Sequence, residues 1–160
     1  MYLLLNCACA QSFEQIDSLL TARVKSGVDS LQIRLISRHT MTSSKTLTII
    51  SRSKEGWYGE AYGFDKRNNK KEITHTFRLT KKCALQPKKN WDIFIAELYR
   101  LNLLSLASKQ CAVLDGMDYT FQIIDNHFAK ETKYNCTGEI PMDDEEKIIL
   151  AIKSDLKKIK

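Results

Sequence analysis

The sequence predicts an α+β fold in which an antiparallel β-meander of about six strands is packed by helices. Alternating apolar and polar residues recur between residues 31 and 80, with short polar turns between them. Residues 91–101 then carry apolar side chains at helical spacing, and two further alternating segments flank Asp125-Asn126-His127. Strands that follow one another through short turns favour an antiparallel sheet over a parallel one. Since an isolated hairpin is marginal in water, the late hairpin must join the early strands over a long sequence separation.

The first ten residues carry no charge and end in Ala8-Cys9-Ala10. Small residues at two alternate positions are what signal peptidase accepts, so we expect cleavage before Gln11. Residues 1–10 are then the remnant of an export signal peptide, and residues 11–160 form a single α+β domain. A short buried N-terminal strand is the alternative. No apolar run approaches the roughly 20 residues of a membrane-spanning helix, so no transmembrane segment is expected in the mature chain.

The first helix is predicted for residues 12–25. Ser12 and Gln15 have the spacing of a capping box, and Gly27 stands where a helix C-terminal cap belongs. The apolar residues of this segment make a loose helical stripe: Phe13, Ile16, Leu19, Leu20 and Val24.

Four strands are predicted to follow, at residues 30–38, 46–51, 57–64 and 72–80. The third strand places its aromatic residues on one face with Glu60, namely Tyr58, Tyr62 and Phe64. Its other face has little bulk apart from Trp57, because it carries Gly59, Ala61 and Gly63. A face of this kind lets a helix or an aromatic ring approach the backbone closely. The aromatic face is interpreted as core packing, with a ligand-binding face completed by Lys66 and Arg67 as the alternative.

The C-terminal part predicts a central helix, a β-hairpin and a final helix. Asn90 is the expected N-cap of the central helix. The hairpin strands are expected at residues 119–124 and 128–134, with His127 in the turn. Acidic residues 143–146 follow Pro141 and complement the positive end of a helix dipole. The apolar positions of that last helix extend to the end of the chain: Ile148, Ile149, Ile152, Leu156 and Ile159.

The residue pattern predicts no catalytic residues, no metal site and no cofactor. His39, His75 and His127 are expected in a loop, a strand and a turn, and no pair has the i, i+4 spacing of a helical metal site. The chain contains no Cys-x-x-Cys, phosphate loop, nucleophile elbow or dinucleotide fingerprint. An enzyme of unknown class is therefore the least favoured reading.

Three cysteines remain once residues 1–10 are removed: Cys83, Cys111 and Cys136. In an oxidising compartment two of them can pair. Cys83 and Cys111 bracket the central helix, and a disulfide between them would stabilise the fold by about 3–4 kcal/mol. The alternative is three reduced cysteines that behave as small apolar residues.

The net charge of +6 favours anionic partners. Basic residues cluster at 66–71, at 81–89 and at the C-terminal tail. Aromatic residues beside a basic cluster are typical of proteins that bind single-stranded nucleic acid. A cytoplasmic polyanion or single-stranded nucleic-acid binding module is therefore the alternative function.

One resemblance rests on the order of these features. A strand meander leads to a helix beginning Trp91-Asp92-Ile93-Phe94, and Asp115-Gly116 then leads into a Tyr-Thr-Phe strand. Over residues 31–135 this resembles small uncharacterised exported bacterial proteins of Bacteroidetes-like genomes, which show a short DG-x-x-Y/W-x-x-E strand after such a helix. Here Gln122 stands at the position of the acid. The resemblance implies a periplasmic or secreted protein, and we expect a non-catalytic binding or structural role in the cell envelope, with an envelope protein or a polyanion as partner.

Overall fold

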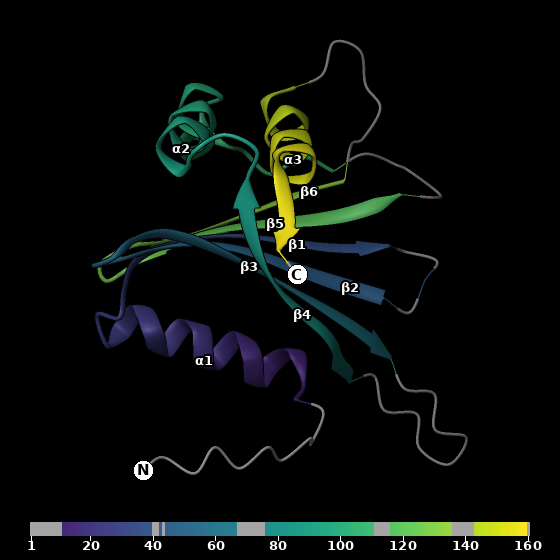
Figure 1. Ribbon diagram of the computed structural model, residues 1–160. Coiled ribbons are helices and arrows are strands. Elements are labelled where there is room, and N and C mark those ends of the chain that lie inside the picture. Colours follow the sequence, from purple (N-terminus) through teal and green to yellow (C-terminus); the bar gives the residue numbers. More distant parts are fainter. Residues whose placement is uncertain are drawn as a thin grey trace, which may run out of the picture.

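The computed structural model describes residues 11–39, 42, 44–66, 76–110, 116–135 and 143–159. Figure 1 shows one twisted sheet with helix α1 on one face and helices α2 and α3 on the other. The helices are α1 (Phe13–Lys25), α2 (Trp91–Arg100), the short 3-10 helix η1 (Leu103–Ser105) and α3 (Asp144–Asp155). The strands are β1 (Asp29–His39), β2 (Ser44–Ser53), β3 (Gly56–Lys66), β4 (Phe77–Pro87), β5 (Met117–Asp125), β6 (Ala129–Tyr134) and β7 (Leu156–Ile159).

The seven strands lie in the order β6-β5-β1-β2-β3-β4-β7, and every neighbouring pair is antiparallel. Strands β1 to β4 form the predicted meander. The hairpin of β5 and β6 then returns to the other side of β1, with a register that runs from Leu31 opposite Asp125 to His39 opposite Met117. The α+β class, the antiparallel meander and the long-range attachment of the hairpin are thus confirmed.

Helix α1 is capped as the sequence predicts. The Ser12 hydroxyl accepts a hydrogen bond from the Gln15 amide at 3.2 Å, and the Gln15 side chain accepts one from the Ser12 amide at 2.8 Å. Gly27 follows the helix with φ of 74°, a conformation that glycine adopts without strain. Leu19 was expected in the apolar stripe but is 54% exposed, because the buried stripe steps from Ile16 to Leu20.

Helices α2 and α3 cover the opposite face of the sheet and enclose the larger of two apolar clusters. Asn90 caps α2 by accepting a hydrogen bond from the Ile93 amide at 2.9 Å. The predicted close approach to the third strand is confirmed at Gly59, where an added Cβ would lie 2.8 Å from the Trp91 ring. The smaller cluster lies under α1 and includes the aromatic residues Phe13, Tyr62, Phe64 and Phe77.

The end of the chain was predicted wrongly. The last helix was expected to run through Leu156 and Ile159, but α3 ends at Asp155 and the chain continues as β7. The outer edge of β4 offers unpaired backbone groups, and β7 pairs with it from Pro87 opposite Leu156 to Ala84 opposite Ile159. Tertiary pairing therefore outweighs helical spacing here, and the sheet has seven strands where about six were expected.

Strand β4 also differs in its bounds from the strand predicted at residues 72–80. It runs from Phe77 to Pro87, and the segment 67–75, which includes His75 and Arg67, lies outside the described residues. His39 was expected in a loop and instead ends β1, opposite Met117. His127 lies in the β5–β6 turn as predicted. Across the described ranges, no helix combines the length and the apolar character that crossing a membrane requires.

Candidate functional site

The aromatic residues of the predicted ligand-binding face lie beneath α1. Tyr62 and Phe64 are 4% and 1% exposed, and the Phe64 ring packs edge-on against Phe13 at 5.3 Å between centroids. Their burial supports the core-packing interpretation and leaves neither ring accessible to a ligand. The Lys66 ammonium lies 5.3 Å from the centroid of the Phe77 ring, and Arg67 lies outside the described residues.

Tyr58 belongs to a buried polar network between α1 and the sheet. The centre of this network is Asp29, which is fully buried at the start of β1. Its carboxylate accepts hydrogen bonds from the Tyr58 hydroxyl at 2.6 Å and the Gln32 side chain at 2.7 Å. It also pairs with the Arg23 guanidinium at 3.1 Å. One buried carboxylate thus ties α1, β1 and β3 together.

A second cation, Arg34, extends the network beneath α1 although it is only 1% exposed. Its Nη1 lies 2.7 Å from the Asp17 carboxylate, and its Nε and Nη2 donate to the Gln32 Oε1 at 2.9 and 2.6 Å. Burial of the guanidinium lowers the pKa of Arg34, and the Asp17 and Asp29 carboxylates oppose this shift. A buried cation is tolerated here because its donors are engaged by carboxylate and amide oxygens.

The exposed end of the network contains Arg23, Glu60 and Lys82. The Glu60 carboxylate forms ion pairs with the Lys82 ammonium at 2.9 Å and with the Arg23 guanidinium at 3.2 Å. It also accepts a hydrogen bond from the Tyr62 hydroxyl at 3.0 Å. Burial alone would raise the pKa of Glu60, but the hydrogen bond and charge of Lys82, with Tyr62 and Arg23, hold it below its usual value.

Tyr58 is held in its protonated form. Burial and the hydrogen bond to Asp29 raise the pKa of Tyr58 to about 12, so its hydroxyl remains a donor at neutral pH. An open cleft of about 700 Å³ lies between the C-terminal end of α1 and the β2–β3 turn and reaches Arg23, Asp29 and Tyr58. Since these three side chains bond one another, we interpret the network as structural.

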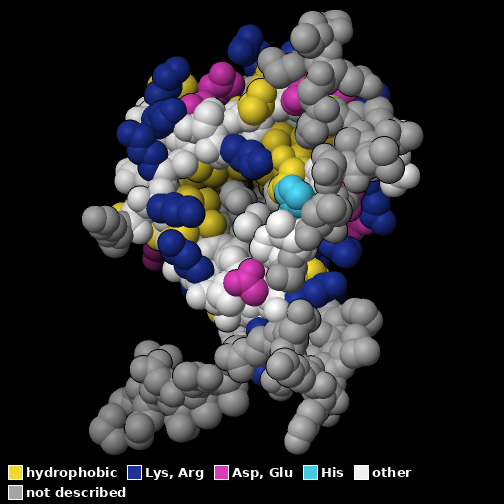
Figure 2. Space-filling model, turned by 90° about the vertical axis from the view of Figure 1, so that its right-hand side faces the viewer, with side chains coloured by type: hydrophobic (Ala, Val, Ile, Leu, Met, Phe, Trp, Pro, Cys, Tyr) yellow, Lys and Arg dark blue, Asp and Glu magenta, His cyan; other side chains and the backbone are white. Residues whose placement is uncertain are grey.

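A different cleft lies on the α2/α3 face of the sheet, and we call it the sheet cleft. Its floor consists of small side chains from three adjacent strands: Thr46 and Thr48 of β2, Ala61 and Gly63 of β3, and Cys83 of β4. Its volume is about 350 Å³, within the range of small-molecule sites. Figure 2 shows the end of the sheet where this hollow opens, with Lys and Arg side chains along one side.

Register explains why the sheet cleft is open. Ile50 and Gly59 are opposite one another in the row that α2 covers, whereas the next two rows contain Thr48 opposite Ala61 and Thr46 opposite Gly63. An added Cβ at Gly63 would have its nearest neighbour at 3.6 Å, in contrast to 2.8 Å at Gly59. The same strand face is therefore closed by Trp91 at one end and open at the other.

Two lysines form the edge of the sheet cleft. Lys81 lies opposite Gly63 in β4, and Lys158 lies opposite Leu85 in β7. Within the described part of the chain, neither ammonium has a carboxylate partner, whereas the neighbouring Lys82 and Lys88 pair with Glu60 and Asp155. Lys45 and the Asp65 carboxylate also line the cleft, so its lining carries three ammonium groups and one carboxylate and is positive overall.

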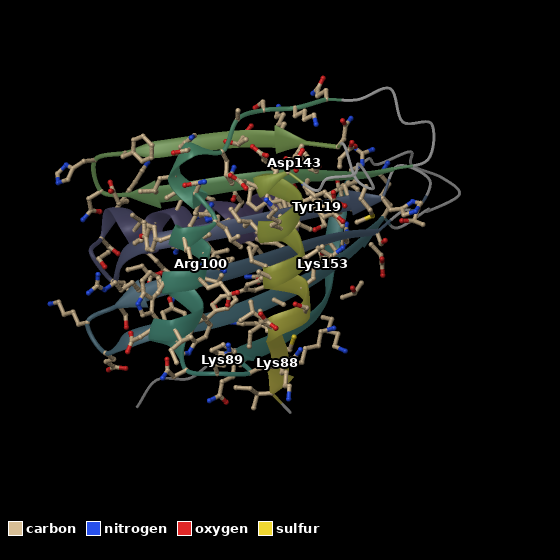
Figure 3. The ribbon with its side chains drawn as sticks, turned by 90° about the horizontal axis from the view of Figure 1, so that it is seen from above. Lys88, Lys89, Arg100, Tyr119, Asp143 and Lys153 are labelled. Atoms are coloured by element: carbon tan, nitrogen blue, oxygen red, sulfur yellow. The ribbon has the colours of Figure 1, made fainter. Side chains whose placement is uncertain are left out.

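Helix α3 places a further ammonium beyond the cleft on the same face. Lys153 donates to the Tyr119 hydroxyl at 2.8 Å, and its Nζ lies 5.0 Å from the Tyr119 ring centroid. Figure 3 shows this pair on the side of α3 that faces away from α2. Tyr119, Ser37 and Thr46 are register partners across β5, β1 and β2, so the row continues from this pair to the cleft floor.

Cys83 is a free thiol in the structure and is half-buried in the cleft floor. Cys111 and Cys136 lie outside the described residues, so the disulfide between Cys83 and Cys111 stays a prediction. In the described ranges, no three His, Cys, Asp or Glu side chains are placed to hold a metal ion.

Sequence reasoning found only part of the sheet cleft. The sequence predicts a strand face with little bulk at Gly59, Ala61 and Gly63, but it does not show how much of that face a helix covers. Lys158 was missed because its segment was expected to be helical. Comparison of the chain with models of known families, with curated proteins and with solved structures finds no match.

Proposed function

We propose that this chain is an exported, non-catalytic binding protein of the bacterial cell envelope, and that its ligand occupies the sheet cleft. The observation that carries the proposal is the combination of a small-residue floor with two lysines that lack carboxylate partners among the described residues. A floor of methyl groups, one thiol and backbone accepts an apolar body, and the lysines attract an anionic end. The ligand class is a small amphiphilic anion, such as a medium-chain carboxylate.

The chemistry of the cleft favours binding over catalysis. A nucleophilic hydroxyl or thiol is ordinarily activated by a base within hydrogen-bond distance. In the described residues no hydrogen bond joins Thr46, Thr48 or Cys83 to such a base. The nearby lysines are exposed on strands β4 and β7 and serve as counter-charges rather than as buried bases.

Binding of single-stranded nucleic acid is the weaker alternative. Such binding needs accessible aromatic rings on which bases stack. Tyr62 and Phe64, the rings expected for that role, are enclosed under α1. The basic residues of β4 and β7 provide charge without a stacking surface.

Substitution of Gly63 by leucine tests the cleft directly. The backbone of Gly63 is not in the left-handed region, and an added Cβ would make only ordinary van der Waals contacts, so the variant should fold while its side chain fills the cleft. We expect decanoate to shift the amide resonances of residues 46–48, 61–63 and 81–83 in the native protein, and to bind the variant at least about 10-fold more weakly. The matched control is Ala129→Leu, an exposed strand position on the opposite face of the sheet. Equal decanoate binding by Gly63→Leu and the native protein would remove the sheet cleft as the site.

The preference of the sheet cleft for an anion is tested by comparing two ligands that differ in the sign of their charge. Decyltrimethylammonium carries the same chain with the opposite charge and should bind more weakly than decanoate. The double substitution of Lys81 and Lys158 by glutamine should abolish that difference, whereas Lys25→Gln on α1 should leave it. A native protein that prefers the cationic ligand would contradict the proposed ligand class.

Export is tested separately by the intact mass of the protein made from its native gene. We expect a chain that begins at Gln11 and fractionates with the envelope. Alkylation before and after reduction would show in the same samples whether Cys83 is paired. A chain that retains Met1 would contradict export without bearing on the sheet cleft.

A further inference from the structure

The structure contains a second, polar cleft on the α1 face of the sheet, beside the helix. Its volume is about 480 Å³, and it lies over β5, β6 and the ends of β1 and β2. Helix α1 covers the middle strands and leaves this corner open, with Phe13 at the boundary. It lies on the opposite face of the sheet from the sheet cleft and shares Lys45 with it as a lining residue.

Register places its polar side chains in three adjacent rows. Asp118 lies opposite Arg38 in the first row, Thr120 lies opposite Lys133 in the second, and Gln122 lies opposite Glu131 in the third. All six side chains alternate onto the same face of antiparallel strands. They line one concave surface although they come from β1, β5 and β6.

The charges of this surface nearly cancel. Lys133 lies 3.6 Å from Glu131, and Arg38 has Asp118 as its cross-strand neighbour. The Lys45 ammonium at the boundary rests on the Phe13 ring, 3.2 Å from the centroid, and burial lowers its pKa. A surface that alternates carboxylate, amide, hydroxyl and cationic groups has many hydrogen-bond donors and acceptors but little net attraction for an ion.

One hydrogen-bonding group in the cleft is unsatisfied. The Gln122 Nε2 donates to Glu131 at 3.0 Å, and this bond fixes the orientation of the amide. The Gln122 Oε1 is buried and accepts no hydrogen bond from any residue that the structure describes. Native proteins leave few buried acceptors without a hydrogen bond, so this oxygen calls for a partner that the described residues do not supply.

We propose that the polar cleft binds a saccharide through its hydroxyl groups. A sugar hydroxyl donates and accepts at once, so neighbouring hydroxyls match the mixed carboxylate, amide and cationic groups of the three rows. The Gln122 Oε1 is buried, so a ligand hydroxyl would donate to it once that side chain turns toward the cleft. The near-neutral charge distinguishes this ligand from the amphiphilic anion of the sheet cleft and from a polyanion.

The test is a titration of the ¹⁵N-labelled protein with neutral trisaccharides of glucose, galactose and N-acetylglucosamine, followed by amide chemical shifts. We expect at least one of them to shift the resonances of residues 118–122 and 131–133 at concentrations up to about 10 mM. Inorganic phosphate is the anionic comparison and should not shift these resonances. No shift with any of the trisaccharides, or shifts confined to other parts of the sheet, would overturn the proposal.

Gln122→Met separates a binding role from a structural one. The variant removes the unsatisfied acceptor, so we expect a Tm that is unchanged or raised by about 2–4 °C, together with at least a 10-fold loss of trisaccharide binding. Gln86→Met is the matched control, because Gln86 is an exposed strand glutamine outside the cleft. Retention of trisaccharide binding by Gln122→Met would overturn the proposal.

Two further variants keep the result interpretable. If Gln122→Met unfolds, Thr120→Val removes one hydroxyl from the middle row with little change of volume, and it should also weaken trisaccharide binding. Gly63→Leu should leave trisaccharide binding intact, and Thr120→Val should leave decanoate binding intact. The failure of one site can therefore be told apart from the failure of the other.

Discussion

Replacement of Asp29 by alanine is expected to lower the free energy of unfolding by about 3–5 kcal/mol. Asp29 is fully buried, and its carboxylate is the shared partner of Arg23, Gln32 and Tyr58. The substitution removes the acceptor of the Tyr58 hydroxyl and one of the two acceptors of the Gln32 side-chain amide, which keeps its bond to the Leu20 carbonyl. It also takes from Arg23 a buried carboxylate partner. Burying an unpaired polar group is far more destabilising than losing a hydrogen bond on the surface.

Urea denaturation measures this loss as a lower midpoint at unchanged slope, which indicates an intact native fold with reduced stability. Asp65→Ala is the control, because it removes an exposed carboxylate at the end of β3 and should change the stability by less than about 0.5 kcal/mol. If Asp29→Ala were no more destabilising than Asp65→Ala, the network beneath α1 would not be held together by this carboxylate.

Replacement of Gly59 by alanine is expected to destabilise the protein by about 1–3 kcal/mol. The new Cβ would lie 2.8 Å from Cη2 of Trp91 and 3.0 Å from Cβ of Leu85. Trp91 is the first residue of α2 and packs edge-on against Phe94, so it cannot withdraw without disturbing the core beneath α2. Within a strand, alanine is otherwise more favourable than glycine. The expected loss of stability therefore comes from the close contact with Trp91 and Leu85.

Gly63→Ala provides the comparison within the same strand and on the same face. Its Cβ would meet only ordinary contacts, at 3.6 Å from Lys81 and 3.7 Å from Thr80. We expect no loss of stability and a gain of about 0.4–1 kcal/mol, because alanine reduces the conformational entropy of the unfolded chain. Thermal denaturation of the two variants measures the difference. Equal Tm values would contradict the conclusion that this strand face is closely packed at Gly59 and open at Gly63.

The two clefts share an origin in the way the helices cover the sheet. Helix α1 lies over the middle strands of one face and leaves the corner at β5 and β6 open. On the other face, α2 and α3 leave the ends of β2, β3 and β4 open. A sheet of seven strands is wider than the helices packed on it, and its uncovered corners are where polar or small side chains replace the apolar core.

The sequence by itself determined the local elements. The Ser12 capping box, the Asn90 cap, the turn at His127 and the two-residue period of β5 and β6 depend on neighbouring residues, and each was predicted correctly. The aromatic face of β3 was likewise expected to pack in the core, which holds for Tyr62 and Phe64, whereas Tyr58 joins the polar network around Asp29. These features follow from local hydrogen bonds and side-chain alternation, which do not depend on the rest of the chain.

Only the tertiary structure decided which surfaces stay open. Gln32 and Arg34 alternate with apolar residues as if they faced water, yet both are buried because α1 lies over them and supplies Asp17 and the Leu20 carbonyl as partners. The segment from Leu156 to Ile159 has helical spacing but becomes β7, because the edge of β4 needs a hydrogen-bonding partner. Lys158 thereby reaches the sheet cleft. Such outcomes depend on groups far apart in sequence, so no local pattern can predict them.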